Sequence, residues 1–527
     1  MNTQSKVHAH ESMDITLLDI GKMLDSSELI GNAGVRINRL QMDSRKIESG
    51  DIFLALKGER FDAHEFLADI AKIPNISAVV QKSSKTTVEQ LGMNAVLVED
   101  TKEALGELAK AWRAKNPIPL IAVTGSNGKT TVTQMIASIL RAYAGDDSLA
   151  TEGNLNNDIG LPQTLLRLRE NHLCAVVELG MNHPGEIEYL AGIAQPNVCL
   201  VNNAQREHQE FMNTVEAVAI ENGQVINALN NSGVAVFPAD DEFTNLWVKM
   251  CGSKPYLTFS DALNSLDSNA SLGLHGQKAN IQLIKSAFVN GEWALTVNTP
   301  AGIIEAKLQI AGEHNVKNAL AAITCCVALK VPLSEISKGL SQFRAVKGRS
   351  RLLKLNVKGL VNGSNVQSPT NTVTLDVIDD TYNANPDSVI AAINVLSQMS
   401  APRLLILGDM GEVGEDGPEY HQEVGEYAAS KGINSVFGLG DLTLHTVQAF
   451  NKKSPQSAHE TGIHYSDMDT LINGLSKVPS HFKSVLVKGS RFMKMERSVQ
   501  ALESFQEIQI ENKQVQQSAQ NKESTCC

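Results

Sequence analysis

The residues best suited to chemistry lie in one segment that joins an apolar strand to a helix. Leu120-Ile-Ala-Val-Thr-Gly-Ser-Asn-Gly-Lys-Thr-Thr131 contains the strand and a glycine-rich turn, and an amphipathic run follows. Glycines let the backbone pass close to a phosphate, whose charge sits on free N–H groups at the helix N-terminus. Lysine supplies a cation, and threonine supplies an oxygen for Mg²⁺. The predicted phosphate site comprises Gly125, Ser126, Asn127, Gly128, Lys129, Thr130 and Thr131.

This loop is a shortened variant of the common phosphate loop. Val123 stands where the longer motif has its first glycine. A short glycine turn can also be structural only, but the order of strand, loop and helix favours phosphate binding. Phosphate loops serve kinases, GTPases, motors and ligases alike, so the loop by itself does not define the reaction.

Two further predicted strands end in polar residues. Ala175-Val-Val-Glu178 places Glu178 at a carboxyl end, and His208 follows the strand Val198–Val201. Ligands of open α/β sheets bind at the carboxyl ends of strands. A carboxylate there suits Mg²⁺, and a histidine could ligate a second cation or a phosphate oxygen. Taken singly, each residue could instead be a capping or surface side chain.

Composition narrows the class of protein. The chain has 527 residues and a net charge of −12, with no basic stripe of the kind that nucleic-acid binding requires. The longest uncharged apolar run, Ala319–Leu329, is about half of the ~20 residues that a membrane span needs. The N-terminal segment lacks the apolar core of a secretory signal. We therefore expect a cytoplasmic globular protein without nucleic-acid partners or membrane insertion.

The elements that must position these residues indicate an α/β fold in three domains. Residues 1–115 mix short strands and helices, and 116–347 alternate strands and helices around a parallel sheet of the phosphate-loop ATPase type. Residues 348–505 restart the alternation and predict a smaller, Rossmann-like domain. Asn356–Val373 is rich in Asn, Ser and Thr and is predicted to be a mobile insertion. The tail, 506–527, is predicted to be disordered.

Ordered motifs resemble those of the Mur ligase family, the ATP-dependent amide-forming enzymes of peptidoglycan synthesis, which also includes folylpolyglutamate synthase. The marks are Thr124-Gly-Ser-Asn-Gly-Lys-Thr-Thr131, Glu178, Gly312-Glu-His-Asn-Val-Lys-Asn318, Gly348-Arg349 and Asp380. They occur at compatible spacing over most of the chain. Five such motifs in order are specific to this family.

Within the family, the chain is most similar to the members that add D-alanyl-D-alanine to UDP-N-acetylmuramoyl-tripeptide. Tyr382-Asn-Ala-Asn-Pro386 is the sharpest element, because ligases that add a free amino acid carry other residues there. The other similar segments are Asp43-Ser-Arg45, Gly50–His64, Gly153–Pro162, Leu407–Glu412 and Lys488-Gly-Ser-Arg491.

The resemblance implies a two-step mechanism. The terminal carboxylate of the UDP-linked tripeptide attacks the ATP γ-phosphate, and the dipeptide amine then displaces phosphate from the acyl phosphate. Lys129 and Arg349 would neutralise charge, and Mg²⁺ would be held by Thr130, Glu178 and His208. Because Arg349 lies on the predicted connector between domains, domain closure would bring it onto the γ-phosphate.

The resemblance also implies the binding residues. Asn315 and Asn318 would hold the adenine edge, and Asp380 the ribose or the hinge. The residues that would hold the UDP end are Ser44, Arg45, Lys57, Arg60 and His64. The path of the sugar and peptide would be lined by Asn154, Asn156, Asn157 and Asn182, which without the resemblance would read as a polar loop. The dipeptide would face Tyr382, Asn383, Asn385, Lys488, Ser490 and Arg491.

One position departs from the family pattern. Many members have a carbamoylated lysine that ligates a second Mg²⁺, and the matching position here is Asn222. A neutral amide lacks the charge that a hard cation prefers. Three alternatives are open: His208 and Glu178 hold the metal with waters, Glu207 or Glu221 substitutes, or Asn222 orients the γ-phosphate. We hypothesise that the protein needs no carbamate derived from bicarbonate.

Other functions are weighed against this one. A ligase of the same family could use a free amino acid or glutamate as acceptor. A small-molecule phosphotransferase could use the same loop with Glu178 and His208, and a nucleotide-gated scaffold would bind ATP without turnover. The polar residues at strand ends in three domains favour the enzyme. We expect a monomer that uses ATP, Mg²⁺, UDP-N-acetylmuramoyl-tripeptide and D-Ala-D-Ala.

Overall fold

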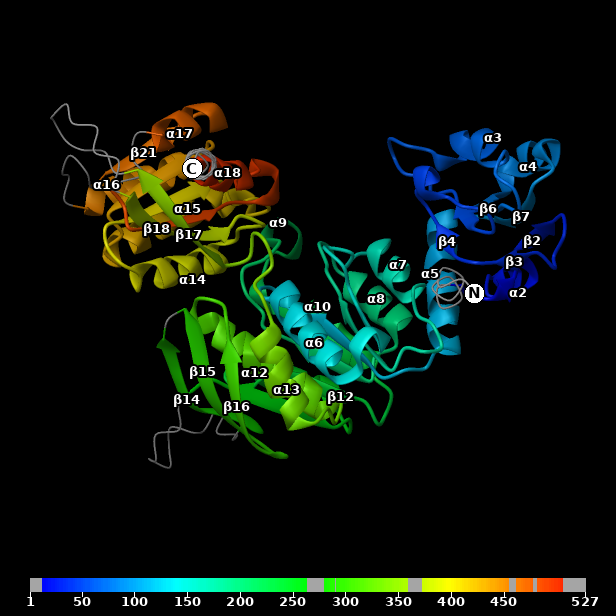
Figure 1. Cartoon of the computed structure of the whole chain (residues 1–527), viewed down its shortest axis with the longest axis horizontal. Helices are drawn as coiled ribbons and strands as arrows, with labels where there is room; N and C mark the ends of the chain where they lie inside the picture. Colours follow the sequence, from blue (N-terminus) through cyan, green and yellow to red (C-terminus); the bar gives the residue numbers. More distant parts are fainter. Residues whose placement is uncertain are drawn as a thin grey trace, which may run out of the picture.

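The computed structural model describes residues 12–262, 279–289, 291–358, 372–454, 461–476 and 481–505. They fold into three α/β domains that follow one another along the chain (Figure 1). In Figure 1 the N-terminal domain is blue, the C-terminal domain is yellow to red, and the central domain lies between them. The expected three-domain α/β class is confirmed. The tail that was predicted to be disordered lies outside the described residues.

The N-terminal domain is built on a small sheet with strand order β2-β7-β6-β5-β4. Strands β4 to β7 run parallel, so their carboxyl ends share one edge, and β2 is antiparallel to β7. Its main elements are β1 (Ile15–Thr16), α2 (Leu17–Lys22), β2 (Glu28–Ile30), β3 (Arg36–Ile37), β4 (Leu40–Gln41), β5 (Ile52–Leu54), α3 (Leu67–Ile70), β6 (Ser77–Gln81), α4 (Lys85–Leu91), β7 (Asn94–Val98) and α5 (Thr101–Lys115).

The central domain contains a nine-stranded sheet with the order β16-β15-β14-β13-β12-β11-β8-β10-β9. Its strands are β8 (Leu120–Thr124), β9 (Ser148–Ala150), β10 (Cys174–Glu178), β11 (Val198–Val201), β12 (Val234–Pro238), β13 (Tyr256–Ser260), β14 (Ile281–Val289), β15 (Glu292–Thr299) and β16 (Gly302–Leu308). Its helices are α6 (Lys129–Ala144), α7 (Gly160–Leu165), α8 (Glu186–Ala194), α9 (Gln209–Met212), α10 (Val215–Asn227), α11 (Thr244–Cys251), α12 (Glu313–Ala328) and α13 (Leu333–Gln342).

The central sheet is parallel only in part. Strands β8 to β14 pair in parallel, as expected, but β14, β15 and β16 form an antiparallel extension that the sequence analysis did not predict. Buried and more exposed residues alternate along β15 and β16. Such alternation is typical of antiparallel strands with one wetter face, whereas strands covered on both faces read as continuous apolar runs.

Alternate residues of β8 build the two cores beside the central sheet. Ile121 and Val123 pack with helices α6 and α12, and Leu120 and Ala122 pack with α8 and α10. All four side chains are fully buried. The second of these cores continues through α5 into the N-terminal domain. Because strand β8 is enclosed on both faces, the loop that follows it is held on a rigid base.

The C-terminal domain is a second, smaller layered domain with strand order β17-β18-β22-β19-β20-β21. Only β17 is antiparallel to its neighbour. The strands are β17 (Arg351–Lys358), β18 (Thr372–Asp380), β19 (Arg403–Gly408), β20 (Ser435–Leu439), β21 (Gly462–Tyr465) and β22 (Ser484–Lys488). The helices are α14 (Pro386–Ser397), α15 (Gly417–Ser430), α16 (Thr443–Lys453), α17 (Met468–Leu475) and α18 (Glu496–Ser504).

The predicted insertion Asn356–Val373 was wrong at both ends. Asn356 to Lys358 complete β17, and Thr372 and Val373 begin β18, with Asn356 paired to Thr374. These strand ends form through backbone pairing between β17 and β18, which polar residue types do not prevent. Residues 359–371 lie outside the described residues. None of the helices in the described part of the chain combines the length and apolar character that a bilayer crossing requires.

Candidate active site

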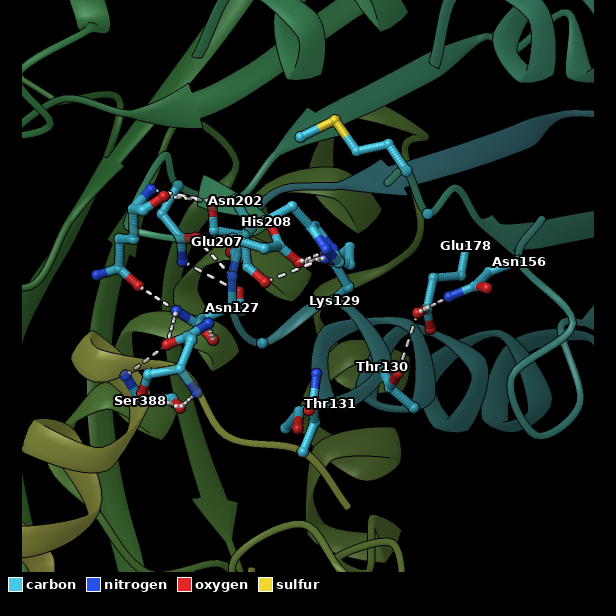
Figure 2. A pocket seen from close by; sticks show the side chains of 18 of the residues that line it. Asn127, Lys129, Thr130, Thr131, Asn156, Glu178, Asn202, Glu207, His208 and Ser388 are labelled. Atoms are coloured by element: carbon cyan, nitrogen blue, oxygen red, sulfur yellow. Dashed lines mark hydrogen bonds and ion pairs between the residues drawn. The ribbon is translucent and has the colours of Figure 1, made fainter. Parts of the chain in front are cut away.

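A cleft of about 1250 Å³ lies between the central and C-terminal domains. We call it the nucleotide cleft. It is lined by the loop after β8, the loops after β10 and β11, the start of α12 and the segment from Asp380 to Ala392. Figure 2 shows these side chains converging from separate elements. Carboxyl ends of parallel strands and helix N-termini therefore meet in one place, which is the usual ligand position in such sheets.

Two glycines let the phosphate loop take its shape. Gly125 and Gly128 have positive φ values of 130° and 81°. A Cβ atom on Gly128 would lie 2.5 Å from the side-chain oxygen of Asn318, so a larger residue would also collide there. Gly128 precedes α6, and no side chain caps that helix. Its first N–H groups are therefore available to an anion.

The lysine of the loop is held by a carboxylate. Lys129 Nζ donates to the carbonyl oxygens of Gly125 and Ser126, at 2.6 and 3.0 Å, and forms an ion pair with Glu207 at 2.7 Å. Burial would raise the pKa of Glu207, but Lys129 and His208 lower it. Glu207 is therefore ionised. Its Oε2 atom is buried without a hydrogen-bond partner in the described part of the chain.

Glu178 is placed to face a cation. Thr130 Oγ1 donates to Glu178 Oε1 at 3.0 Å, and Asn156 Nδ2 donates to the same oxygen at 2.8 Å (Figure 2). Glu178 is 2% exposed, and its Oε2 has no hydrogen-bond partner among the described residues. A buried carboxylate beside a hydroxyl oxygen suits Mg²⁺, which binds through one or two carboxylates together with substrate phosphates. Among the residues that the structure describes, no group of three or more His, Cys, Asp or Glu side chains could hold a metal ion.

His208 lies where the two domains meet. Its Nε2 is 3.4 Å from Glu207, and its Nδ1 is 2.5 Å from Glu412 of the C-terminal domain. Burial lowers the pKa of His208, but the two nearby glutamates outweigh burial and raise it to about 9. The backbone of His208 is left-handed, with φ of 50°. In this arrangement the imidazole is a cation in an ion pair between domains.

A chain of amides supports the phosphate loop from α12. Asn318 Nδ2 donates to Asn315 Oδ1 at 2.9 Å, and Asn202 Nδ2 donates to Asn318 Oδ1 at 3.1 Å. Asn202 also donates to the Asn127 carbonyl at 2.8 Å. Asn315 and Asn318 are almost fully buried and line the cleft. The structure thus brings both residues to the rear of the phosphate loop.

The C-terminal domain supplies the opposite wall. Lys488 Nζ pairs with Asp380 at 2.6 Å and donates to the Asn383 carbonyl at 2.9 Å. Burial opposes ionisation of Asp380, but Lys488 lowers the pKa of this carboxyl. The Arg349 guanidinium stacks 3.9 Å from the centre of the Tyr382 ring. All five residues line the cleft, which the phosphate loop also lines.

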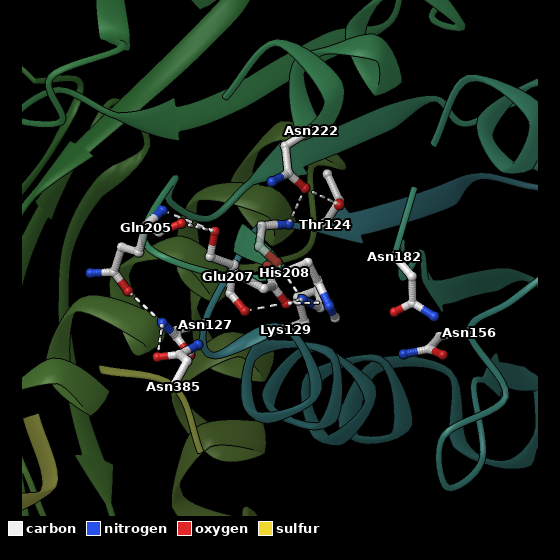
Figure 3. Close-up of polar contacts among 12 residues, drawn as sticks. Thr124, Asn127, Lys129, Asn156, Asn182, Gln205, Glu207, His208, Asn222 and Asn385 are labelled. Atoms are coloured by element: carbon white, nitrogen blue, oxygen red, sulfur yellow. Dashed lines mark hydrogen bonds and ion pairs between the residues drawn. The ribbon is translucent and has the colours of Figure 1, made fainter. Parts of the chain in front are cut away.

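A group of asparagines extends the cleft toward the N-terminal domain. Figure 3 shows Asn156 and Asn182 at this side of the phosphate loop. The whole group lines the cleft and comprises Asn154, Asn156, Asn157 and Asn182. At its far end Lys102 of α5 pairs with Asp158 at 2.5 Å. The cleft therefore runs from the phosphate loop to the first turn of α5.

Several predicted residues lie outside the cleft. Ser490 is buried and accepts the Gly411 N–H at 2.6 Å, which is a packing role. Arg491 is exposed and pairs with Glu496 at 3.1 Å, and its guanidinium carbon is 5.9 Å from the centre of the Tyr382 ring. Of the residues predicted for the phosphate loop, Ser126 to Thr131 line the cleft and Gly125 does not.

The residues predicted to hold the UDP end also lie apart from the nucleotide cleft, in the N-terminal domain. Ser44 and Arg45 follow β4, and Lys57 follows β5, so they share the carboxyl edge of that sheet. His64 accepts the Gln81 N–H at 3.0 Å at the end of β6. We call this set the N-terminal group, and its members are Ser44, Arg45, Lys57, Arg60 and His64.

Asn222 of α10 supports the start of the phosphate loop. Its Oδ1 accepts from Thr124 Oγ1 at 2.6 Å and from the Gly125 N–H at 2.9 Å (Figure 3). Asn222 does not line the cleft, and Glu221 is occupied by the Ile187 N–H at 2.9 Å. Of the carboxylates weighed as substitutes for a carbamate, only Glu207 faces the cleft. Its place directly before His208 was the signal in the sequence.

Sequence reasoning missed two residues beside the cleft. Gln205 accepts from Asn127 Nδ2 at 2.6 Å within the central domain, and Arg206 joins the two domains by pairing with Asp387 at 2.6 Å. Both residues follow β11, in the segment that also carries His208. Their position after a strand end was visible in the sequence, but their partners are more than 70 residues away along the chain.

The fold and the cleft define a nucleotide-binding α/β enzyme whose site is shared between two domains. Comparison with known proteins specifies the family. The model of the Mur ligase middle domain matches residues 123–326. The Mur ligase glutamate ligase domain matches 368–491, and the Mur ligase catalytic domain matches 36–113. The chain belongs to the Mur ligase family.

Two relatives of this chain carry the same name. The UDP-N-acetylmuramoyl-tripeptide–D-alanyl-D-alanine ligase of Haemophilus influenzae is 37% identical over 90% of this chain and 96% of its own length. The enzyme of the same name from Escherichia coli is 35% identical over 93% and 99%. A crystal structure of MurF from Acinetobacter baumannii is 31% identical, has a TM-score of 0.78, and covers 94% of this chain and all of its own.

Proposed function

We propose that this chain is an ATP-dependent ligase that joins D-alanyl-D-alanine to UDP-N-acetylmuramoyl-tripeptide and releases ADP and phosphate. The observation that carries the proposal is that the phosphate loop and the Tyr382–Asn385 segment line one cleft. Family membership and the shared name of the full-length relatives support it. The product is the UDP-linked pentapeptide precursor of peptidoglycan.

The reaction needs two joined steps. A carboxylate oxygen of the tripeptide attacks the γ-phosphorus, and the bond to the β-phosphate oxygen breaks, which leaves an acyl phosphate and ADP. The dipeptide amine then attacks the acyl carbon, loses a proton, and phosphate leaves. Such chemistry depends on positioning and charge neutralisation. Lys129 and Arg349 both line the cleft and would together bind the transferring phosphoryl group.

Mg²⁺ fits the residues that are present. Thr130 and Glu178 offer oxygen ligands. Oε2 of Glu178 has no hydrogen-bond partner among the described residues, and a bound Mg²⁺ would supply one interaction for it. His208 lies at the domain boundary and would ligate the ion through a ring nitrogen only after it has lost its proton or given up a contact with Glu207 or Glu412. When bound, the ion supplies charge neutralisation for the phosphates and fixes their orientation.

The three domains divide the substrates between them. In this proposal residues 1–115 bind the UDP end through the N-terminal group, 116–347 bind ATP, and 348–505 bind the acceptor. The group of Asn154, Asn156, Asn157 and Asn182 would contact the sugar and peptide along the cleft. Asn315 and Asn318 would hold the adenine edge, and Asp380 the ribose.

The experiment that tests the proposal is phosphate release from ATP in the presence of Mg²⁺ and UDP-N-acetylmuramoyl-tripeptide. D-Ala-D-Ala, single D-Ala, L-Glu and no acceptor are compared. Release that depends on the dipeptide is expected. Release with only another acceptor would agree with membership of the family but would show that the acceptor is not D-Ala-D-Ala. A phosphorylated product without free phosphate would indicate a phosphotransferase.

A further inference from the structure

The segment after β11 makes a cluster of contacts with the C-terminal domain. Arg206 lies at its centre and is mostly buried, with 23% of its side chain exposed. Its Nη2 lies 2.6 Å from Asp387 Oδ1, and its backbone N–H donates to Asp387 Oδ2 at 2.9 Å. Its Nη1 donates to Glu423 at 2.7 Å. One arginine thus contacts α14 and α15 together.

The surroundings favour the charged and ordered form of this side chain. Burial disfavours the charge, but Asp387 and Glu423 raise the pKa of Arg206 above its usual range. The guanidinium also lies 5.2 Å from the centre of the Tyr420 ring. A planar fork that binds two carboxylates and faces an aromatic ring exploits geometry that lysine does not have.

The contacts reach the chemistry through α14. Asn385 begins this helix by accepting the Ser388 N–H, and its Nδ2 donates to Asn127 of the phosphate loop at 2.9 Å (Figure 3). Asp387 lies in the same first turn. Arg206 therefore holds the start of the helix that follows Tyr382 and Asn383, two residues that line the same cleft as Lys129.

We propose that Arg206 is a positioning residue that docks the acceptor-binding domain onto the phosphate loop. The expected kinetic effect rests on the proposed function, whereas the docking of the two domains does not depend on it. Arg206 does not line the nucleotide cleft, so it acts through α14 and α15 rather than on the substrates. Two neighbouring contacts, Glu412 with His208 and the Glu210 N–H with the Glu412 carbonyl, secure the same boundary.

The test compares Arg206→Met with Arg206→Lys and with Arg497→Met. Arg497 pairs with Asp469 on the exposed surface of the C-terminal domain and serves as the matched control. We expect Arg206→Met to raise KM for the dipeptide about tenfold and KM for ATP less, with KM for the UDP-linked tripeptide unchanged, because breaking a hydrogen bond between charged groups costs about that much. Arg206→Lys should lie between, and Arg497→Met should match the wild type.

Asp387→Asn supplies the coupling measurement. If the two residues act together, Arg206→Met in the Asp387→Asn background should cost less than it does in the wild type. Equal changes in all three KM values, or additive effects, would overturn the proposal. Thermal unfolding of each variant shows whether it is folded.

Small-angle X-ray scattering without substrates separates this proposal from the ligase proposal. We expect Arg206→Met to have a larger radius of gyration than the wild type and Arg497→Met. An unchanged scattering curve would overturn the docking role even if the enzyme is a ligase. A larger radius together with no dipeptide-dependent phosphate release in the wild type would retain the docking role and reject the ligase.

Discussion

The nucleotide cleft and the N-terminal group present their charges in opposite ways. Lys129 in the cleft is 13% exposed and pairs with a carboxylate that is 11% exposed. Arg45 in the N-terminal group is 85% exposed and Lys57 is 55% exposed, with Lys57 3.6 Å from Asp62. Charges interact more strongly where water is excluded than at the surface, where solvent and salt screen them. The phosphate loop thus holds a buried ion pair, whereas Arg45, which pairs with Asp43 at 2.8 Å, and Lys57 are open to solvent.

The two regions also differ in how many elements they need. The N-terminal group lies along the carboxyl edge of one small sheet. The nucleotide cleft takes residues from the loops after five strands of the central sheet, β8 to β12, from α5 and α12, and from the C-terminal domain. A change in the cleft should consequently affect the chemical step, whereas a change in the N-terminal group should affect one substrate.

The largest effect is expected for Lys129→Ala. Loss of this cation removes charge neutralisation at the transferring phosphate and leaves Glu207 buried without its partner. We expect dipeptide-dependent phosphate release to fall by about 10³-fold, as for loss of a preorganised group at a developing charge. Lys110→Ala on the exposed face of α5 is the control. If Lys129→Ala releases phosphate within tenfold of the wild-type rate, the nucleotide cleft does not differ from the N-terminal group in its effect on the chemical step.

Glu178→Gln should have the next largest effect. Glutamine keeps an oxygen for Thr130 but lacks the charge, so affinity for Mn²⁺ in the presence of ADP should fall by about 10- to 100-fold. Electron paramagnetic resonance of Mn²⁺ measures this without turnover. Glu152→Gln, an exposed carboxylate paired with Arg167, should bind Mn²⁺ like the wild type. Equal affinities in the two variants would exclude Glu178 as a ligand.

A smaller and more selective effect is expected for Arg45→Ala. Loss of a charged hydrogen bond to the substrate should raise KM for the UDP-linked tripeptide about tenfold. kcat and KM for ATP should not change, because this residue lies outside the nucleotide cleft. Arg36→Ala, which removes an exposed pair with Asp14 in the same domain, is the control. A fall in kcat would show that the two regions are not separate.

Removal of CO₂ should have no effect. Asn222 has no amine to carbamoylate, and its Oδ1 is occupied by Thr124 and the Gly125 N–H. We expect equal rates of phosphate release in degassed buffer with and without added bicarbonate. Activity that collapses in the degassed buffer and recovers with bicarbonate would contradict this and would indicate a carbamate elsewhere in the cleft.

Local patterns were sufficient for elements that are buried on both faces. The predicted strand Val198–Val201 matches β11 at both ends, and all four of its residues are buried. Apolar runs bounded by turns or caps make such elements visible. Strands β14 to β16 were missed because half of their residues face a wetter side, and the polar ends of β17 and β18 were taken for a loop.

The sequence by itself determined the three-domain α/β class, the phosphate loop and the carboxylate at the end of β10, because each depends on residues that are close together in the chain. Tertiary structure decided which charges meet. It paired Lys129 with Glu207, Asp380 with Lys488 and Arg206 with Asp387, over separations of 78, 108 and 181 residues. The first two pairs depend on the order of strands within a domain and the third on how two domains pack, and no local pattern of residues records either.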